Sequence, residues 1–445
     1  MSTERLKWVL ILVPACLVMA GCLYNNVREV EPDQSFQGLN RVYQSGGSTL
    51  NVVFVHGMGH HPFGEEGLLD YQIKIAKELG FGEDASQGGV NWGAYCKADY
   101  RGYAHFSEAE EERLKARRKK DQAICPLKIN NVIVGFIGWR QYRSPGDGNT
   151  LNLFELSWDR TTELLQKTIL ELDDDYYETV ELDDDLKPIN GGRNRESDRA
   201  WINRLLKKFV SQNLGDPAIY LGAYGNSIRR VVVEGLSRIA AVSGANRKHD
   251  YSIVSDSLGS RVVFEALGCA LDADGANADS GCEYLLTDRK FAAARLKTLS
   301  DMASSTTQVF MNANQLPFLA LSNVRPPNEN EDEKDWLNRF PCESGGPGLV
   351  RYLQGRKLLK EPVQIVAFTD PNDALSYHLT ERFRKKCTHL GGNGYRPVEF
   401  INVRIPNVKW TFGIFANPNK AHSGGFRAND DAIKLLVNGY RVEGK

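Results

Sequence analysis

Short runs of consecutive apolar residues, each followed by a polar or glycine-rich loop, recur along this chain. Such runs, rich in Val and Ile, predict strands that are buried on both faces of a sheet. They cover residues 51–55, 131–139, 151–158, 251–255, 307–312, 363–369 and 399–404. Helical spacing of apolar or charged positions predicts helices over residues 71–79, 108–122, 161–172, 200–212, 218–242 and 427–438. This alternation of strands and helices predicts an α/β fold with a mostly parallel central sheet flanked by helices.

One folded domain over residues 49–445 accounts for most of the chain, since α/β domains with insertions reach such lengths. The segment 82–250 is expected to carry large helical and loop insertions. Part of its helical region, residues 200–242, is expected to lie over or beside the pocket as a lid or a wall. Residues 22–48 are polar and irregular, which predicts a tether between the membrane and the folded domain.

The first residues have the layout of an export signal. Two basic side chains precede an apolar run over residues 8–19 that is too short for a resident transmembrane helix. The sequence Met-Ala-Gly-Cys that ends at Cys22 resembles the bacterial lipobox. This resemblance implies that residues 1–21 are a lipoprotein signal peptide and that Cys22 carries the lipid anchor. Leu23 then favours the outer membrane, facing the periplasm. The alternative is a plain signal peptide cut near Ala20.

The charge balance gives no reason to expect a nucleic acid partner, because 55 basic and 56 acidic residues leave a net charge of −1. Two acidic clusters, at residues 171–175 and 181–185, have a composition that could bind calcium. Their spacing is not that of an EF-hand loop, so a solvated loop is the preferred interpretation.

Six of the eight cysteines remain when Cys16 and Cys22 are set aside. An even number in an exported chain predicts disulfides, and the pairing expected here joins the nearest neighbours in sequence. The expected pairs are Cys96–Cys125, Cys269–Cys282 and Cys342–Cys387.

Residues 251–267 contain the stretch on which the functional argument depends. A buried strand is followed by Ser255-Asp256-Ser257-Leu258-Gly259 and then by a helical pattern. A strand that runs into a helix through a tight turn of small residues lifts the central side chain off the sheet, and here that side chain is Ser257. The alternative is an ordinary strand–loop–helix connection whose serine lies at the surface and has no catalytic role.

A serine hydroxyl needs a base within hydrogen-bond reach, and the base needs a third group that fixes its tautomer. His422 is the best candidate for the base, because it lies beyond the last predicted strand in a loop with flexible neighbours. The acid is Asp373 or, as the alternative, Asp370; both follow the strand at 363–369. Asp373 is preferred because it lies farther out, whereas Asp370 precedes a proline and is suited to capping the turn.

Two backbone N–H groups are expected to stabilise an oxyanion. Leu258 N–H comes with the turn after Ser257, and Met58 N–H comes from the His56-Gly57-Met58-Gly59 loop after the first buried strand. His56 is expected to hold that loop. His60 and His61 could ligate a metal, but without a matching carboxylate set they are interpreted as polar loop residues, so no metal site is predicted.

Together, these two loops, the strand-end aspartates and the late histidine resemble the α/β-hydrolase superfamily on its lipase and esterase side. This chain differs from the family pattern at Ser255, where the family usually has glycine. It implies an α/β-hydrolase fold and a serine hydrolase that cleaves carboxylic esters through an acyl-enzyme on Ser257. The expected substrate is an acyl ester or lipid, with no cofactor. The alternatives are an amidase or thioesterase with the same triad, and a non-catalytic envelope lipoprotein that uses the fold as a scaffold.

Overall fold

The structure is a computed structural model, and only part of the chain is described from it. The described residues are 29–30, 34–45, 48–58, 66–82, 123–129, 132–144, 146–158, 162, 165, 181–182, 188–189, 215–243, 249–272, 289–323, 326–334, 363–388, 398–406 and 421–442.

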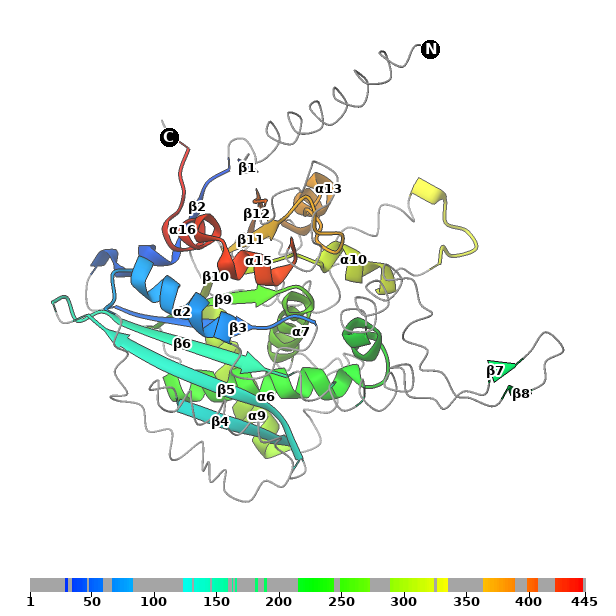
Figure 1. The fold of residues 1–445 in the computed structure, drawn as a ribbon, viewed down its shortest axis with the longest axis horizontal. Helices are drawn as coiled ribbons and strands as arrows, with labels where there is room; N and C mark the ends of the chain where they lie inside the picture. Colours follow the sequence, from blue (N-terminus) through cyan, green and yellow to red (C-terminus); the bar gives the residue numbers. More distant parts are fainter. Residues whose placement is uncertain are drawn as a thin grey trace, which may run out of the picture.

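Strands and helices alternate along most of this part of the chain (Figure 1). The strands are β1 (Glu29–Val30), β2 (Phe36–Gln37), β3 (Thr49–Val55), β4 (Ala123–Ile129), β5 (Val132–Arg143), β6 (Thr150–Ser157), β7 (Glu181–Leu182), β8 (Pro188–Ile189), β9 (His249–Asp256), β10 (Thr306–Asn312), β11 (Val363–Thr369), β12 (Val398–Arg404) and β13 (Gly439–Tyr440). The helices are η1 (Leu39–Ser45), α2 (Glu66–Glu78), α6 (Gly225–Ser243), α7 (Leu258–Asp272), α9 (Arg289–Ser305), α10 (Leu316–Ala320), η5 (Leu321–Asn323), α13 (Glu381–Thr388), α15 (Ser423–Ala428) and α16 (Asp430–Asn438).

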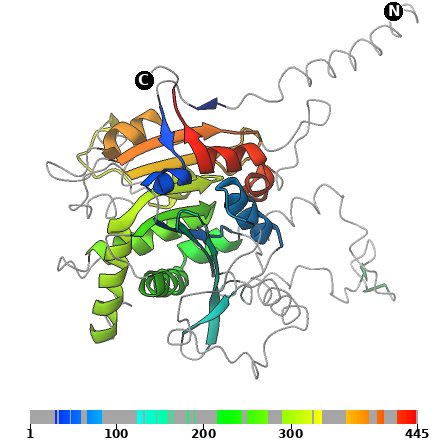
Figure 2. The same ribbon diagram turned by 90° about the vertical axis from the view of Figure 1, so that its left-hand side faces the viewer.

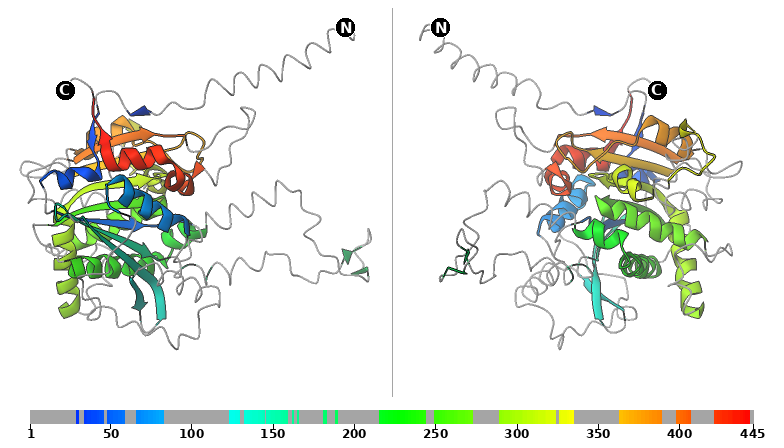
Figure 3. Two further views of the ribbon diagram at one scale, coloured as in Figure 1. Left: turned by 60° about the vertical axis from the view of Figure 1, so that its left-hand side comes forward. Right: turned by 90° about the vertical axis from the view of Figure 1, so that its right-hand side faces the viewer.

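A nine-stranded sheet in the order β1-β12-β11-β10-β9-β3-β6-β5-β4 forms the centre of the molecule. The run from β6 through β3, β9, β10 and β11 to β12 is parallel. Only the edges are antiparallel, where β5 joins β6 and β4, and β1 joins β12. The two views of Figure 3 show the twist between the orange strands at one end and the teal strands at the other. The mixed α/β fold with a mostly parallel sheet is therefore confirmed.

Helices cover both faces of this sheet, which explains why its strands are continuous apolar runs. Successive residues of β3 pack into different cores: Val53 and Val55 face one cluster, and Val52 and Phe54 face the other. The first cluster takes side chains from α6, α7, α9, α10 and α13, and the second takes them from η1, α2, α15 and α16. Figure 2 shows blue α2 with red α15 and α16 on one side of the sheet, and green α6 and α7 on the other.

The expectation that residues 22–48 form only a tether is wrong for the described residues of that segment. β1 pairs with β12, and β2 pairs with β13 near the chain end. Phe36, Leu39 and Val42 are buried in the second cluster. Their spacing of three residues places these apolar side chains on one side of the chain, so the folded domain begins before residue 49.

Two predicted helices are broken in the structure. The predicted helix at 427–438 is divided into α15 and α16 at Asn429, whose side chain accepts hydrogen bonds from the N–H groups of Asp431 and Ala432 at 3.0 and 3.3 Å. This N-cap starts a new helix at Asp430. The predicted helix at 218–242 is interrupted at residues 222–224, before α6 begins.

The segment 82–250 contributes more to the core than the predicted insertions suggested, since it supplies β4, β5, β6 and α6. Helix α6 packs against these strands and against α7 and α9, so it is a core helix on a face of the sheet. The predicted helices at 108–122 and 200–212 lie outside the described residues. That residues 200–214 form a lid or a wall of the pocket therefore stays a prediction. Of the helices described, none has the length and apolar character needed to cross a bilayer.

A buried carboxylate joins α7 to the helical residues before it. Glu265 is 8 % exposed and accepts hydrogen bonds from Arg261 and Arg229, each at 2.9 Å, and from the Tyr220 hydroxyl at 2.5 Å. Burial alone would raise the pKa of Glu265, but the two guanidinium groups and the Tyr220 hydroxyl hold that pKa below its ordinary value of 4.5.

We expect Glu265→Gln to lower the free energy of unfolding by roughly 3 kcal/mol at pH 7, because it removes the carboxylate charge that faces the buried Arg261 and the partly buried Arg229. A lowered folded-state pKa stabilises the protein above the ordinary carboxyl pKa, and this contribution is lost as the pH falls through the folded-state value. The difference between wild type and variant should therefore shrink below about pH 4 in urea titrations. The matched control is Glu381→Gln, which removes an exposed pair with Lys385 and should leave the free energy of unfolding almost unchanged. Equal losses for both variants would contradict the prediction.

Candidate active site

Ser257 lies on a sharp turn between β9 and α7. Its φ is 52°, a left-handed conformation that non-glycine residues seldom adopt and that functional turns often hold. The Ser257 N–H donates to the carbonyl of Asn312 at 2.8 Å, which joins the turn to the end of the neighbouring strand β10. The turn therefore has the geometry that the sequence pattern predicts.

Close backbone packing around this turn requires small residues. A Cβ atom on Gly259 would lie 2.4 Å from the carbonyl oxygen of His56, and one on Gly57 would lie 2.6 Å from the Ser257 Cβ. The loop after β3 therefore packs directly against the turn. Ser255 is accommodated because its hydroxyl is paired with that of Ser260 at 2.9 Å and donates to a strand carbonyl at 3.3 Å.

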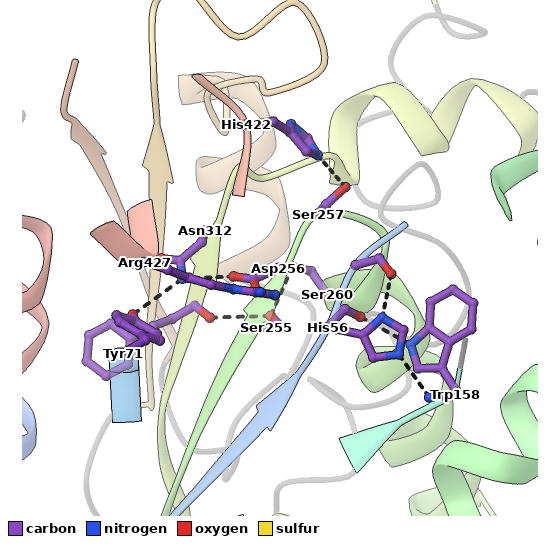
Figure 4. A network of polar contacts seen from close by, with 12 residues as sticks. His56, Tyr71, Trp158, Ser255, Asp256, Ser257, Ser260, Asn312, His422 and Arg427 are labelled. Carbon is purple, nitrogen blue, oxygen red and sulfur yellow. Dashed lines mark hydrogen bonds and ion pairs between the residues drawn. The ribbon is translucent and has the colours of Figure 1, made fainter. Parts of the chain in front are cut away.

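His422 reaches Ser257 from the N-cap position of α15. The Ser257 hydroxyl is 2.8 Å from His422 Nε2, and His422 Nδ1 is 2.7 Å from Asp373 Oδ2 (Figure 4 shows the Ser257–His422 contact). All three residues are buried, with exposures of 0 %, 7 % and 6 % for Ser257, His422 and Asp373. A carboxylate on Nδ1 favours the tautomer with the proton on that nitrogen. Nε2 is then left to accept the serine proton.

The two candidate acids play different parts in the same turn. Asp373 Oδ1 accepts from the N–H of Leu375 at 2.9 Å, which fixes the carboxylate with its other oxygen toward His422. Asp370 Oδ1 instead accepts from the N–H of Asn372 at 2.7 Å, as a turn cap does. The structure thus brings Asp373, and not Asp370, to the histidine.

The loop after β3 is held by His56. Its Nε2 accepts from the backbone N–H of Trp158 at 2.9 Å, and its Nδ1 lies 2.8 Å from the carbonyl of Gly57. The indole of Trp158 stacks on the imidazole and donates to the His56 carbonyl at 3.1 Å. Both ring nitrogens are therefore engaged, and the expected structural role of His56 is confirmed.

The predicted oxyanion donors are the N–H groups of Leu258, which follows Ser257, and of Met58, in the loop after β3. Leu258 is the first residue of α7, where a backbone N–H has no partner within its own helix. The Met58 side chain is 2 % exposed, and its sulfur is 3.6 Å from Gln315 Nε2. This side-chain contact anchors the residue whose N–H is the second predicted donor.

Other predicted site residues fall partly outside the described chain. Cys22, the predicted lipidation site, and the pair His60 and His61 lie there. Within the described ranges, no group of three His, Cys, Asp or Glu side chains is arranged to hold a metal ion. Cys125 forms a disulfide. Of the other cysteines, Cys96, Cys282 and Cys342 lie outside the described residues, and the side chains of Cys269 and Cys387 are not described.

Sequence reasoning missed a buried polar network next to the turn (Figure 4). Asp256 pairs with Arg427 of α15, and its other oxygen accepts from Asn312. The hydroxyl of Tyr71 lies 3.5 Å from the Asn312 amide, and burial raises its pKa above the ordinary range, so the phenol stays protonated. The sequence signal was a charged residue, Asp256, directly before the serine at the end of the strand.

No protein-family model, curated protein or solved structure matches this chain. What the site can do is therefore argued from its geometry. A serine hydroxyl, an imidazole and a carboxylate in one hydrogen-bonded series can activate an oxygen nucleophile.

Proposed function

We propose that this chain is a serine hydrolase that cleaves carboxylic esters through an acyl-enzyme on Ser257. The observation that carries the proposal is the series Asp373–His422–Ser257, joined by contacts of 2.7 and 2.8 Å. His422 is the general base that takes the Ser257 proton and then returns it to the leaving alcohol. Asp373 fixes the imidazole tautomer and stabilises the imidazolium that forms.

An α/β-hydrolase fold is the finer fold proposal that accompanies this chemistry. It is supported by a serine on a strained turn after a central parallel strand, and by the chain order Ser, Asp, His. In parallel sheets the loops at the carboxyl ends of the strands meet at one edge, which is where these three residues meet. The N–H groups of Leu258 and Met58 would then stabilise the oxyanion.

Attachment to the bacterial envelope through a lipid on Cys22 is a proposal from the sequence pattern alone. An anchored enzyme would meet acyl esters of membrane lipids, or esters in the periplasm if it faces that compartment. An amidase or a thioesterase would use the same three residues, so the leaving group has to be tested directly.

The test begins with labelling by a small fluorophosphonate, followed by turnover of p-nitrophenyl esters of increasing acyl length. Because Ser257 is fully buried, the shortest acyl chains are measured first. We expect one equivalent of label on Ser257, located by peptide mass spectrometry, and turnover of at least one ester. Label without ester turnover, but with hydrolysis of an anilide or a thioester, would favour those leaving groups. A folded protein that neither labels nor turns over any substrate would support the scaffold interpretation.

A further inference from the structure

An ion pair is buried beside the proposed nucleophile. Arg427 Nε and Nη2 both donate to Asp256 Oδ2, at 2.8 and 2.5 Å, and Asp256 Oδ1 accepts from the Asn312 amide at 2.9 Å. The side chains of Arg427 and Asp256 are only 4 % and 6 % exposed. Figure 4 shows the guanidinium lying alongside the carboxylate below Ser257. Both oxygens of the carboxylate are therefore bound.

Stability alone does not account for such a pair. Removing two charges from water costs free energy that their attraction only partly returns, and well-packed apolar residues often serve as well. What a buried Arg–carboxylate pair joined by two N–H donors supplies is direction, since it restricts both partners to a narrow range of positions.

The pair joins the two segments that carry the proposed base and nucleophile. Asp256 directly precedes Ser257, and Arg427 lies five residues after His422 on the short helix α15. The first turn of this helix is closed by a hydrogen bond from Gly425 N–H to the His422 carbonyl at 2.8 Å. A shift of Arg427 relative to Asp256 would thus be transmitted to the imidazole through less than two turns of helix.

Apolar packing does not provide the same restriction. α15 contributes Phe426 to the second hydrophobic cluster, where it contacts Phe368. Hydrophobic contacts are non-directional, and a helix of six residues has few of them. The Ser257–His422 hydrogen bond, in contrast, weakens when its atoms separate by a few tenths of an ångström.

We propose that Arg427, through its ion pair with Asp256, is the positioning residue that keeps His422 in hydrogen-bond register with Ser257. This inference deepens the proposed hydrolase function and rests on it. The pair also neutralises Asp256, so that no uncompensated negative charge lies next to the serine where an oxyanion would form.

The experiment compares Arg427→Met, Arg427→Lys and Asp256→Asn with the wild type. We expect Arg427→Met to lower kcat by about 100-fold or more, because misplacement of a catalytic group by about 1 Å has an effect of this size. KM should change by less than about threefold, since substrate binding does not use the pair. Arg427→Lys keeps the charge but not the planar group that directs two N–H donors at one carboxylate oxygen, and should lose about tenfold in kcat.

The matched control is Arg229→Met, which removes another largely buried arginine from a carboxylate, Glu265, at 2.9 Å. It should lower the melting temperature and leave kcat within about twofold, since Glu265 lies about two turns of α7 beyond Ser257. If Arg427→Met does not fold, the kcat values of Arg427→Lys and Asp256→Asn test the proposal instead. Wild-type kcat in the folded variants would overturn the proposal, and so would an equal loss in the control.

A measurement that does not depend on turnover tests the positioning role of Arg427 separately from the proposed hydrolase function. The low-field NMR resonance of the His422 Nδ1 proton, assigned by its loss in His422→Ala, reports the imidazole position. We expect it to shift or broaden in Arg427→Met but not in Arg229→Met. An inactive, unlabelled wild type would refute the hydrolase, and the same resonance would still test the positioning. An unchanged resonance in Arg427→Met would refute the positioning.

Discussion

Replacing Ser257 with Ala is expected to reduce kcat for ester hydrolysis by roughly 10⁴- to 10⁶-fold. The substitution removes the only hydroxyl that the structure places on His422 Nε2, at 2.8 Å, among the residues described. The variant can still activate water and stabilise an oxyanion, but these two effects supply only a small part of the wild-type rate. The measurement is steady-state hydrolysis of a short p-nitrophenyl ester, with circular dichroism as the check on folding. KM should stay within a fewfold of the wild-type value.

The matched control for this variant is Ser260→Ala, three residues farther along the same turn. Ser260 is also fully buried, and its hydroxyl contacts that of Ser255 at 2.9 Å instead of the histidine. We expect it to lose about 1 kcal/mol of stability and to keep kcat within a fewfold. If Ser257→Ala kept more than a tenth of the wild-type rate, the nucleophile would have to be sought elsewhere.

The strand–turn–helix at Ser257 could be predicted from the sequence because its determinants are local. Buried strand residues, small side chains at the turn and a helical pattern all lie within about one element of the serine. The hydroxyl of the unusual Ser255 also has a local partner, Ser260, although its second partner, the Phe310 carbonyl, comes from the neighbouring strand β10. Local patterns of this kind are the most reliable part of a sequence-based argument.

The juxtaposition of Ser257, His422 and Asp373 was also predictable, although 165 and 49 residues separate the paired residues. The reason is topological. Residues that follow parallel strands lie at the same edge of the sheet, whatever their separation along the chain. The choice of Asp373 over Asp370 rested on how far each lies beyond β11, and the structure places Asp373 at the imidazole.

The remaining features depend on contacts that have no local signal. The pairing of Arg427 with Asp256 requires the exact bounds of α15, which the predicted helix at 427–438 did not contain. The strand β4 was missed because Pro126 and Lys128 interrupt its apolar run. Pro126 is tolerated because β4 is an edge strand of the sheet.

The second large effect is expected for Asp373→Asn, which should lower kcat by about 10⁴-fold while the protein stays folded. The amide preserves the shape of the carboxylate but presents an N–H group toward His422. That favours the tautomer with the proton on Nε2, which then faces the Ser257 hydroxyl and cannot accept its proton. The measurement is kcat on the same short ester, together with the rate of fluorophosphonate labelling, which should fall in parallel.

Asp370→Asn is the control that decides between the two acids. The amide oxygen can still accept the Asn372 N–H that Asp370 binds at 2.7 Å, so the turn should persist with a loss below about 1 kcal/mol and kcat should change little. The reverse result, a large loss for Asp370→Asn and none for Asp373→Asn, would assign the acid to Asp370. Equal losses in two folded variants would mean that the turn geometry matters and that neither carboxylate has the charge-specific role. Only a loss confined to Asp373→Asn, with unchanged stability, fits a carboxylate whose task is to fix the tautomer of His422.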